Sequence, residues 1–304
     1  MAVSLSQIKS ELLPGLFDVR GSYDMIPRQW DKVFTTHKSN MALERSSQMR
    51  FLGLPQLKAE GGATAFDNNA GERWVFNFEH QEVALGYAIT RKAIDDNLYK
   101  AQFNPTNLKL QESFSQFKEI QGANILNTAT TYNSAIGGDG QALLSAAHPY
   151  DGGTWANTPS TQVDLSESTL LQGMINVRTG FYNEAGLRIL SRARRLVVPA
   201  ALEPQAIRLT KTELRPGTAN NDVNAILTTS GGLPEGYIVL DFLTSNYSWF
   251  LTTNIDGLVH MLRMPFEMDM QVDFVTDNLL VKGYERYSFG YNDPRAIYGS
   301  TPSS

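Results

Sequence analysis

The segment from Asn104 to about Tyr132, NPTNLKLQESFSQFKEIQGANILNTATTY, constrains the fold of this chain more than any other. Its apolar residues recur every three or four positions, the spacing of one face of an α-helix. Asn104 and Pro105 predict an N-cap and a first helical residue. A helix over 105–131 would be about 40 Å long at ~1.5 Å per residue, as long as a domain is wide. The apolar positions are Leu110, Phe114, Phe117, Ile120 or Gln121, and Ile125.

Gly122 lies inside this predicted helix. Glycine lowers helix stability by roughly 1 kcal/mol relative to alanine. We therefore expect a bend or a close neighbour at this position.

Bulk composition limits the kinds of protein this chain can be. Its 304 residues are 42% hydrophobic and 19% charged, which permits one large domain or two modest ones. The formal net charge of −5 does not favour nucleic acid through long-range electrostatics. The absence of cysteine excludes disulfides, thiolate chemistry and the commonest structural zinc sites. Because no apolar run reaches the roughly eighteen residues of a membrane span, we expect a soluble protein without signal peptide.

The N-terminal residues 1–43 carry scattered apolar side chains between prolines and glycines, and no single period fits them. This pattern predicts an arm of short turns with one small helix near Pro27 to Phe34. Such an arm must pack against this chain or against a neighbour.

Residues 44–89 predict a long excursion followed by strands. The run GLPQLKAEGGATAFDNNAGE is rich in Gly, Ala and Asn, and the alternating segments 74–78 and 83–89 predict two strands, most simply an antiparallel pair. The large aromatics of the first strand, Trp74, Phe76 and Phe78, are hard to bury within so short a span, so we expect a partner surface. The alternative is an ordinary exposed hairpin whose aromatics fold back on the domain.

The later chain predicts further helices and strands. Asp164, with Glu167 in the capping-box position, predicts the start of a helix whose apolar residues have near-ideal spacing. A strand stopped at Pro199, a helix from about Glu203, a helix-like VNAILTT and a strand YIVLDFL suggest a compact α/β subdomain. The alternation over 257–289 predicts long antiparallel strands. The apolar helix positions are Leu170, Met174, Val177 and Phe181.

The sequence shows no constellation of catalytic residues. Its four histidines are far apart in the chain and have no metal-ligand spacing, so each is expected to be a surface or hydrogen-bonded residue. Asp95 and Asp96 would point about 100° apart on a helix and would not converge on one substrate. We therefore expect no catalytic residue, cofactor or metal site, and a structural role gains weight. The histidines are His37, His80, His148 and His260.

Four arginines cluster at Arg188, Arg192, Arg194 and Arg195. Clustered arginines can bind phosphate. In a net-acidic chain, however, they more often pair with carboxylates on the same or a neighbouring subunit.

Several stretches resemble, in the family's order, the major head subunit of Mu-like tailed phages. The resemblance runs nearly end to end and implies an α+β protein with the Hong Kong-97 coat fold. The stretches are LLPGLFDV, IPRQWDKVF, LGLPQLKAEGGATAFDNNAGERW, VALGYAITRKAIDDNLY, GQALLSAAHP, RRLVVPAALEPQAIRL, SWFLTTN and RYSFGYNDPRAIYGS.

The resemblance implies a map of the chain. Residues 1–43 would be the N-arm, and 44–89 the E-loop hairpin that lies on the neighbouring subunit. Residues 90–195 would be the first part of the peripheral domain, with the spine helix at 105–131. Residues 196–257 would form the axial domain at the capsomer centre, and 258–304 would return to the peripheral domain as strands.

The same resemblance implies the function of a major capsid protein. Hexamers and pentamers would form through head-to-tail contacts and close an icosahedral head around double-stranded DNA. The arginine cluster would be an inner basic patch with weak, non-specific contact to that DNA. Intersubunit contacts are expected at Trp74, Phe76, Phe78, Lys58, Glu60, Arg263, Asp293 and Arg295.

Other expected partners also follow from the resemblance. The first Met lies immediately before the N-arm, so we expect a separate scaffold protein in place of a fused one, together with a portal. A cement or decoration protein is a further partner that the family allows. Assembly would take place in the host cytoplasm, the product would be the virion, and no membrane contact is expected. Lys58 and Asn292 are conceivable partners of an isopeptide crosslink by region only.

Two alternatives remain open from the sequence. An encapsulin-type nanocompartment shell would share the fold and enclose an enzyme. A carbohydrate-active enzyme would instead take its carboxylates from distant strands and would have a concave pocket.

Overall fold

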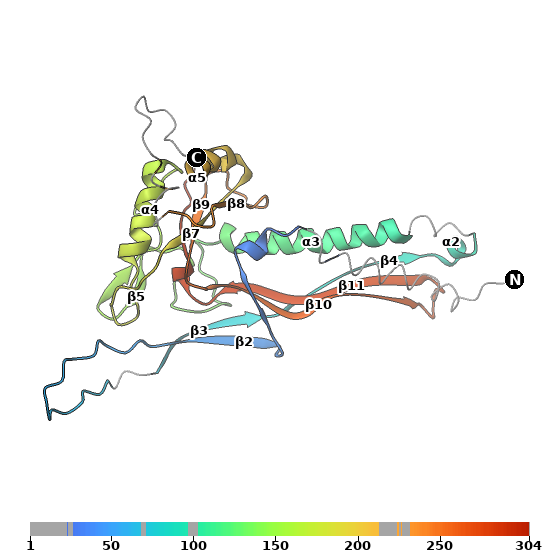
Figure 1. Cartoon of the computed structure of the whole chain (residues 1–304). Coiled ribbons are helices and arrows are strands. Elements are labelled where there is room, and N and C mark those ends of the chain that lie inside the picture. Colours follow the sequence, from blue (N-terminus) through green and yellow to red (C-terminus); the bar gives the residue numbers. More distant parts are fainter. Residues whose placement is uncertain are drawn as a thin grey trace.

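The structure is a computed structural model, and it describes Tyr23, residues 27–67, 71–96 and 103–212, Asn224, Ile226 and residues 232–303. This part of the chain forms an elongated body with a smaller unit at one end and a hairpin that projects from it (Figure 1). The helices are η2 (Trp30–Lys32), α2 (Arg91–Asp95), α3 (Phe103–Asn127), α4 (Glu167–Gly180), η3 (Ala200–Leu202), α5 (Glu203–Lys211) and η4 (Pro294–Ala296). The strands are β1 (Thr35–Lys38), β2 (Leu43–Met49), β3 (Glu72–Glu79), β4 (Gln81–Ile89), β5 (His148–Tyr150), β6 (Gly153–Trp155), β7 (Ala193–Val198), β8 (Tyr237–Val239), β9 (Trp249–Thr253), β10 (Leu258–Val272), β11 (Leu279–Tyr291) and β12 (Ile297–Ser300).

The long helix predicted from the sequence is confirmed as α3, with corrected ends and a corrected face. It begins at Phe103, so Asn104 lies inside the helix and is not its N-cap, and it ends at Asn127 with turns beyond. The buried face includes Lys118 and Glu119, whereas Phe117 is 39% exposed. Adjacent helical residues point about 100° apart, so burying the polar pair turns Phe117 outward.

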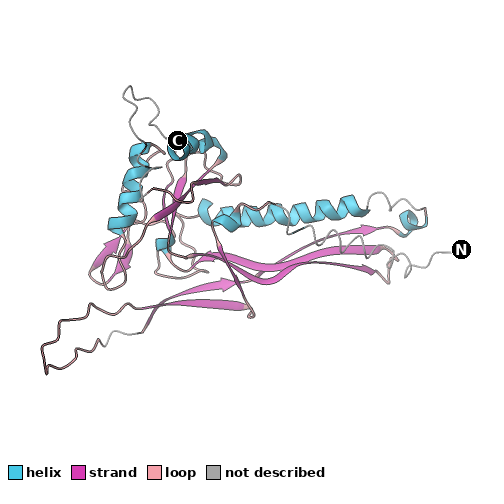
Figure 2. Cartoon of the chain, viewed as in Figure 1, coloured by secondary structure: helices cyan, strands magenta, loops and turns pink. Residues whose placement is uncertain are grey.

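The elongated body is a four-stranded sheet covered by α3 (Figure 2). Its strand order is β1-β10-β11-β4, with β1 parallel to β10 and the other pairs antiparallel. The predicted long strands in the last third of the chain are therefore confirmed. Phe114 of α3 meets the Phe266 ring edge-on at 4.9 Å and packs over Gly283, where a Cβ atom would lie 2.8 Å from the Phe114 ring.

A buried ion pair lies between α3 and this sheet. The Lys118 ammonium contacts the Glu285 carboxylate, and both side chains are less than a tenth exposed. Burial raises the pKa of Glu285, while the Lys118 charge opposes that shift. The ring of Tyr287 lies 4.7 Å from the ammonium and adds a cation–π contact.

The smaller unit is a second four-stranded sheet in the order β12-β9-β7-β8, packed against α4 and α5. The predicted helix from Glu203 is confirmed as α5, and α4 buries three of its predicted apolar positions, while the fourth, Phe181, is buried just after the helix ends. Its N-cap is Ser166, which forms a capping box with Thr169, so the predicted caps at Asp164 and Glu167 are wrong.

The predicted boundaries at 196 and 257 do not coincide with this smaller unit. Its sheet takes β12 from the last predicted segment, and its core takes α4 from the first peripheral segment. The segment VNAILTT and the polar loop before it fall largely outside the described residues.

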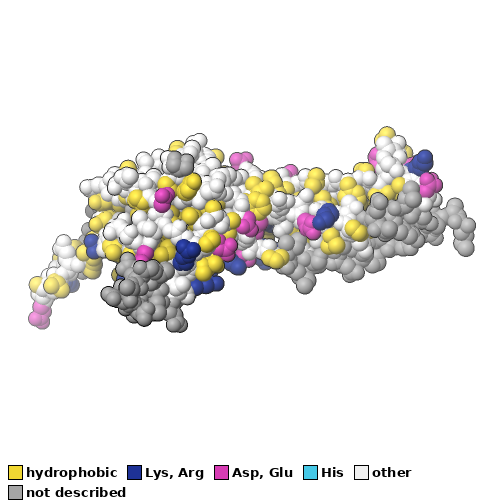
Figure 3. Space-filling view, turned by 90° about the horizontal axis from the view of Figure 1, so that it is seen from above, with side chains coloured by type: hydrophobic (Ala, Val, Ile, Leu, Met, Phe, Trp, Pro, Cys, Tyr) yellow, Lys and Arg dark blue, Asp and Glu magenta, His cyan; other side chains and the backbone are white. Residues whose placement is uncertain are grey.

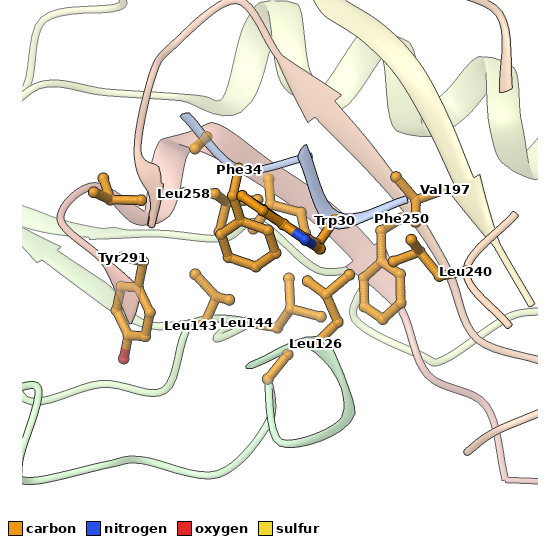
Figure 4. Close-up of a cluster of buried hydrophobic side chains, with 14 of the residues drawn as sticks. Trp30, Phe34, Leu126, Leu143, Leu144, Val197, Leu240, Phe250, Leu258 and Tyr291 are labelled. Carbon is orange, nitrogen blue, oxygen red and sulfur yellow. The ribbon is translucent and has the colours of Figure 1, made fainter. Parts of the chain in front are cut away.

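A strap, residues 27–38, joins the two units. The backbone N–H groups of Gln29 and Trp30 donate to the two carboxylate oxygens of Glu119, at 2.7 and 3.1 Å. The Gln29 side chain also pairs with Asp241 of the smaller unit. Trp30 enters the core that both units share (Figure 4). The predicted arm thus packs on its own chain over this range, while most of residues 1–26 are outside the described part.

The strap also explains Gly122. A Cβ atom there would lie 3.0 Å from Cβ of Trp30 and 3.6 Å from the ring of Phe289. The expected close neighbour is therefore the strap. Any larger residue at position 122 would require Trp30 or α3 to shift.

We expect Gly122→Leu to lower the free energy of unfolding by about 1–3 kcal/mol, because the new side chain must displace Trp30. The matched control is Gly180→Leu near the end of α4, where nothing lies within 4 Å of the added Cβ. Urea unfolding of both variants measures the effect. Equal losses at the two positions would contradict this packing.

Candidate intersubunit surface

The projecting hairpin is built from β2 and β3. Leu43 pairs with Glu79 at its base and Met49 with Glu72 at its far end, so the described residues 50–67 belong to the connecting loop. The predicted strand pair is wrong in its partners, because β3 pairs with β2 whereas β4 pairs with β11. Only His80 separates β3 from β4, so the chain passes from the hairpin into the main sheet at this residue.

The hairpin loop carries large apolar side chains that its own chain does not cover. Leu57 and Phe66 are essentially fully exposed, and four more apolar residues in or beside the loop are more than half exposed. These four are Met49, Phe51, Leu52 and Leu54. Inside the loop, the Gly53 N–H donates to a carboxylate oxygen of Asp67 at 2.7 Å and ties its two arms together. The loop thus exposes its apolar residues on two arms that this hydrogen bond holds together.

Arginines brace the far end of the hairpin against the body. Arg50 and Arg73 both contact the carboxylate of Asp151, on the turn between β5 and β6, and the Arg73 contact measures 2.9 Å. The hydrogen bond from Arg50, followed by the charge of Arg73, lowers the pKa of Asp151. Arg73 also donates to the backbone carbonyl of Glu184 at 3.1 Å. These contacts fix the direction in which the loop leaves the body.

The aromatics that we expected to be exposed are mostly buried in their own chain. Phe76 and Phe78 are 0% and 2% exposed, so the prediction that another copy covers them is wrong. The physical reason is two distant glycines: a Cβ on Gly138 would lie 2.3 Å from the Phe76 ring, and one on Gly290 would lie 2.8 Å from the Phe78 ring. Trp74 is partly buried beside them. The alternative prediction, in which the aromatics fold back on their own domain, is correct for these residues.

Two other expected contact residues are also occupied within the chain. Arg295 binds Asp293 at 2.7 Å and Glu184 at 3.0 Å, and the three side chains are at most 14% exposed. Both charges are satisfied inside one subunit, and the expected roles of Asp293 and Arg295 in contacts between subunits stay predictions. Arg263 is partly exposed on β10.

The two residues of the expected crosslink differ in exposure. Lys58 and Glu60 are exposed in the hairpin loop, where their contacts with another subunit stay predictions. The Asn292 side chain is partly buried, and its amide nitrogen donates to Ser46 at 3.3 Å. The crosslink between Lys58 and Asn292 also stays a prediction.

The arginine cluster is divided by Glu235. This carboxylate binds Arg194 at 2.5 Å and Arg195 at 3.0 Å, so the expected pairing with carboxylates is confirmed for two of the four. Arg188 and Arg192 are exposed, and no ion pair to another described residue is found for either. The expected DNA contact stays a prediction.

An apolar groove of about 390 Å³ lies between α3 and β4. Phe114 and Phe117 line it from the helix, and Val83 and Leu85 line it from the strand. Leu85 is 51% exposed and Phe117 39% exposed, so the groove is open. In the view of Figure 3, apolar side chains lie in patches along the elongated body, with charges of both signs between them.

The sequence predicts a partner surface on this hairpin but places it on the aromatics of β3, and it does not predict the groove. The run 53–72 predicts a Gly, Ala and Asn-rich excursion, although Leu54, Leu57 and Phe66 lie within it. Large apolar residues in a segment that also carries Pro, Gly and charge were the available signal. Apolar spacing places Phe117 on the buried face of α3, because it does not reveal which polar residues of the helix are buried.

The histidines do not form a chemical site among the described residues. Both ring nitrogens of His80 are hydrogen-bonded, to Ser39 at 2.8 Å and Ser288 at 3.1 Å, and His148 contacts Asp139 and Asn157. Burial lowers the pKa of His260 to about 3, so it is neutral. In the ranges that the structure covers, no cluster of acidic or histidine side chains could hold a metal ion, and no helix is long and apolar enough to span a membrane.

Comparison with known proteins supplies the family context. A family model described as phage capsid protein matches residues 79–300. The capsid of a native GTA particle is 12% identical to this chain, with a TM-score of 0.55. The match covers 91% of this chain and 90% of the GTA capsid chain. The procapsid of bacteriophage JBD30 is 12% identical with a TM-score of 0.53, covering 99% and 77%. The virus-like particle from Pyrococcus furiosus is 10% identical with a TM-score of 0.53, covering 95% and 99%. No curated protein matches.

We expect Phe76→Ala to lower the free energy of unfolding by about 3–5 kcal/mol, because it empties a fully buried site. Phe66→Ala in the same hairpin is the matched control and should change it by less than about 0.5 kcal/mol, since that ring is 86% exposed. Urea unfolding of the two variants provides the measurement. A harmless Phe76→Ala would refute the burial of the aromatic face.

We expect Asp151→Asn to loosen the far end of the hairpin at neutral pH, because an amide cannot hold two guanidinium groups. Because the pKa of Asp151 is lowered in the folded protein, its ionised carboxylate stabilises the hairpin fully at pH values above the pKa of an unfolded Asp. This stabilisation is lost as the pH falls through the pKa of Asp151 in the folded protein. Hydrogen exchange of residues 72–75, corrected for intrinsic pH dependence, should rise in the variant and in acidified wild type.

The control for this brace is Asp96→Asn, an exposed carboxylate at the end of α2. It should leave the exchange of residues 72–75 unchanged. Acid-induced loosening that persists equally in Asp151→Asn would show that another group is responsible.

Proposed function

The chain belongs to the phage capsid protein family and is a major capsid protein that forms a head shell, and we propose that loop 50–67 of each subunit docks on the α3–β4 groove of the next. Its α+β fold is that of the Hong Kong-97 coat proteins, as the sequence resemblance implied. Family and fold are structural rather than enzymatic, and the protein is a component of the virion.

The observation that carries the proposal is a pair of uncovered apolar surfaces on one chain. The loop exposes Leu57 and Phe66 almost completely, and the groove exposes Phe117 and Leu85. Large apolar patches on a folded subunit mark surfaces that a partner covers. In a shell, the available partner is another copy of the same chain.

The arrangement of the two surfaces favours a head-to-tail contact. The loop projects beyond the hairpin strands (Figure 1). The groove lies between α3 and β4 of the elongated body. Because the two patches differ, the contact is heterologous, and repeating it closes a ring when the rotation permits. Such rings would be the hexamers and pentamers of an icosahedral head.

Many such contacts would add up in the shell. A single contact of this kind is modest, but a subunit that meets several neighbours would bury well over ~2,000 Å² in total. The smaller unit would face the centre of each capsomer, in the role that the sequence map gives to residues 196–257, and the elongated sheet would lie at its periphery. The shell would enclose double-stranded DNA, and a portal, a separate scaffold and a cement protein would join it in the host cytoplasm.

An encapsulin-type shell has less support. The family model that matches the chain describes phage capsid proteins. The similarity to the virus-like particle from Pyrococcus furiosus, at 10% identity, supports the fold alone.

The proposal is tested by removing the apolar side chains of the loop. We expect the combined change Phe51→Ser, Leu54→Ser, Leu57→Ser and Phe66→Ser to leave a folded subunit that yields at least ten-fold fewer shells in electron microscopy. Phe117→Ser with Leu85→Ser should produce the same defect from the receiving side. Ile175→Ser, at a half-exposed position on α4, is the control and should assemble normally. Shell yields equal to wild type in both sets would refute the docking.

A further inference from the structure

The segment before β7 presents a narrow stripe of three outward side chains, Arg188, Leu190 and Arg192, which we name the arginine–leucine stripe. Exposure alternates along it: Leu190 is 96% exposed, whereas Ile189 is partly buried and Ser191 is 2% exposed. The Ser191 N–H donates to the Ile189 carbonyl at 3.1 Å, which forms a tight turn centred on Leu190. The stripe therefore presents an apolar residue at a turn between two cations.

The stripe is held rigid from behind by Asn254. Its side-chain oxygen accepts from the Arg192 N–H at 2.7 Å, and its side-chain nitrogen donates to the Leu190 carbonyl at 3.3 Å. The Asn254 N–H donates to the Arg192 carbonyl at 3.0 Å. The hydroxyl of Ser191 also donates to the carbonyl of Val177. A backbone fixed this way has little conformational entropy left to lose when a partner binds.

The charges of the stripe stand apart from those of the neighbouring arginines. Arg194 and Arg195 share the carboxylate of Glu235. Arg188 and Arg192 lie exposed, and across the described ranges neither has a carboxylate within ion-pair distance. Two guanidinium groups with Leu190 between them are thus available at the surface.

We propose that the arginine–leucine stripe docks an extended acidic segment of a partner polypeptide, in which an apolar side chain lies between two carboxylates. A peptide with two carboxylates that flank an aliphatic residue is complementary to this surface in charge and polarity. Each guanidinium can take a carboxylate through two parallel hydrogen bonds, and Leu190 packs on the apolar side chain.

The composition of the stripe favours a peptide over nucleic acid. Affinity for duplex DNA comes mainly from the number of phosphates that cations neutralise. The stripe offers two cations in a chain of net charge −5. Leu190 gains nothing from phosphate, but an apolar side chain of a peptide would bury it. The proposed partner of the stripe is therefore a peptide, whereas the sequence led us to expect DNA.

The test uses the full-length subunit and fluorescein-labelled peptides in fluorescence anisotropy at low salt. A peptide centred on Glu-Thr-Leu-Thr-Glu should bind. Versions centred on Gln-Thr-Leu-Thr-Gln and Glu-Thr-Ser-Thr-Glu should bind at least five-fold more weakly, because the first lacks the charges and the second lacks the apolar anchor. Salt should weaken the binding of the first peptide, since the charges are exposed.

Variants of the subunit provide the second arm. Arg192→Ser and Leu190→Ser should each reduce peptide affinity at least five-fold, while Arg208→Ser, an exposed arginine on α5, should leave it unchanged. All three side chains are exposed, so the thermal unfolding of the variants should match that of wild type.

The proposal is overturned by any of three results. The first is that the acidic peptide does not bind the subunit. The second is that the uncharged peptide binds equally well, or that Arg208→Ser weakens binding as much as Arg192→Ser. The third is that a short DNA duplex binds more tightly than the peptide and depends on Arg192 but not on Leu190, which would assign the stripe to nucleic acid.

Discussion

The packing of α3 on the β10–β11 pair is the contact on which the rest of the molecule depends. It encloses the Lys118–Glu285 ion pair, and such a pair is strongly destabilising to break, because each partner alone would be an uncompensated buried charge. One turn further along α3, Gly122 admits Trp30 of the strap, which in turn binds the smaller unit through Gln29 and Asp241. Helix, sheet, strap and smaller unit are thereby held as one body, and the side of α3 that carries Phe117 remains open.

The rigidity of that body explains how a thin hairpin can project from it. Phe76 and Phe78 fill spaces that Gly138 and Gly290 leave empty, and Asp151 holds two arginines near the far end. The base of the hairpin therefore behaves as part of the core. The apolar residues beyond this base are left without cover in their own subunit, and this division between a buried base and an exposed loop creates the need for a neighbour.

Sequence reasoning succeeded where a pattern is local and failed where it depends on distant residues. The helices α3, α4 and α5 and the strands β10 and β11 have periodicities that are complete within their own segments. The partner of β3 was misassigned because the nearest strand in sequence is not its neighbour in space. Burial of Phe78 is decided by Gly290, more than 200 residues away, which no local pattern reveals. The apolar residues of the exposed loop are visible in the sequence, but the larger aromatics of the flanking strand drew the predicted partner surface to themselves.

The central claim is that the loop of one subunit lies in the groove of another, and disulfide trapping tests it most directly. The natural sequence has no cysteine, so Leu57→Cys combined with Phe117→Cys introduces the only thiols. Oxidised shells of this variant should give a ladder of covalent oligomers up to pentamers and hexamers on a denaturing gel, with mass spectrometry finding the peptide containing residue 57 joined to the one containing residue 117. Assembled shells that remain monomeric after oxidation, or that form the link within one chain, would contradict the account.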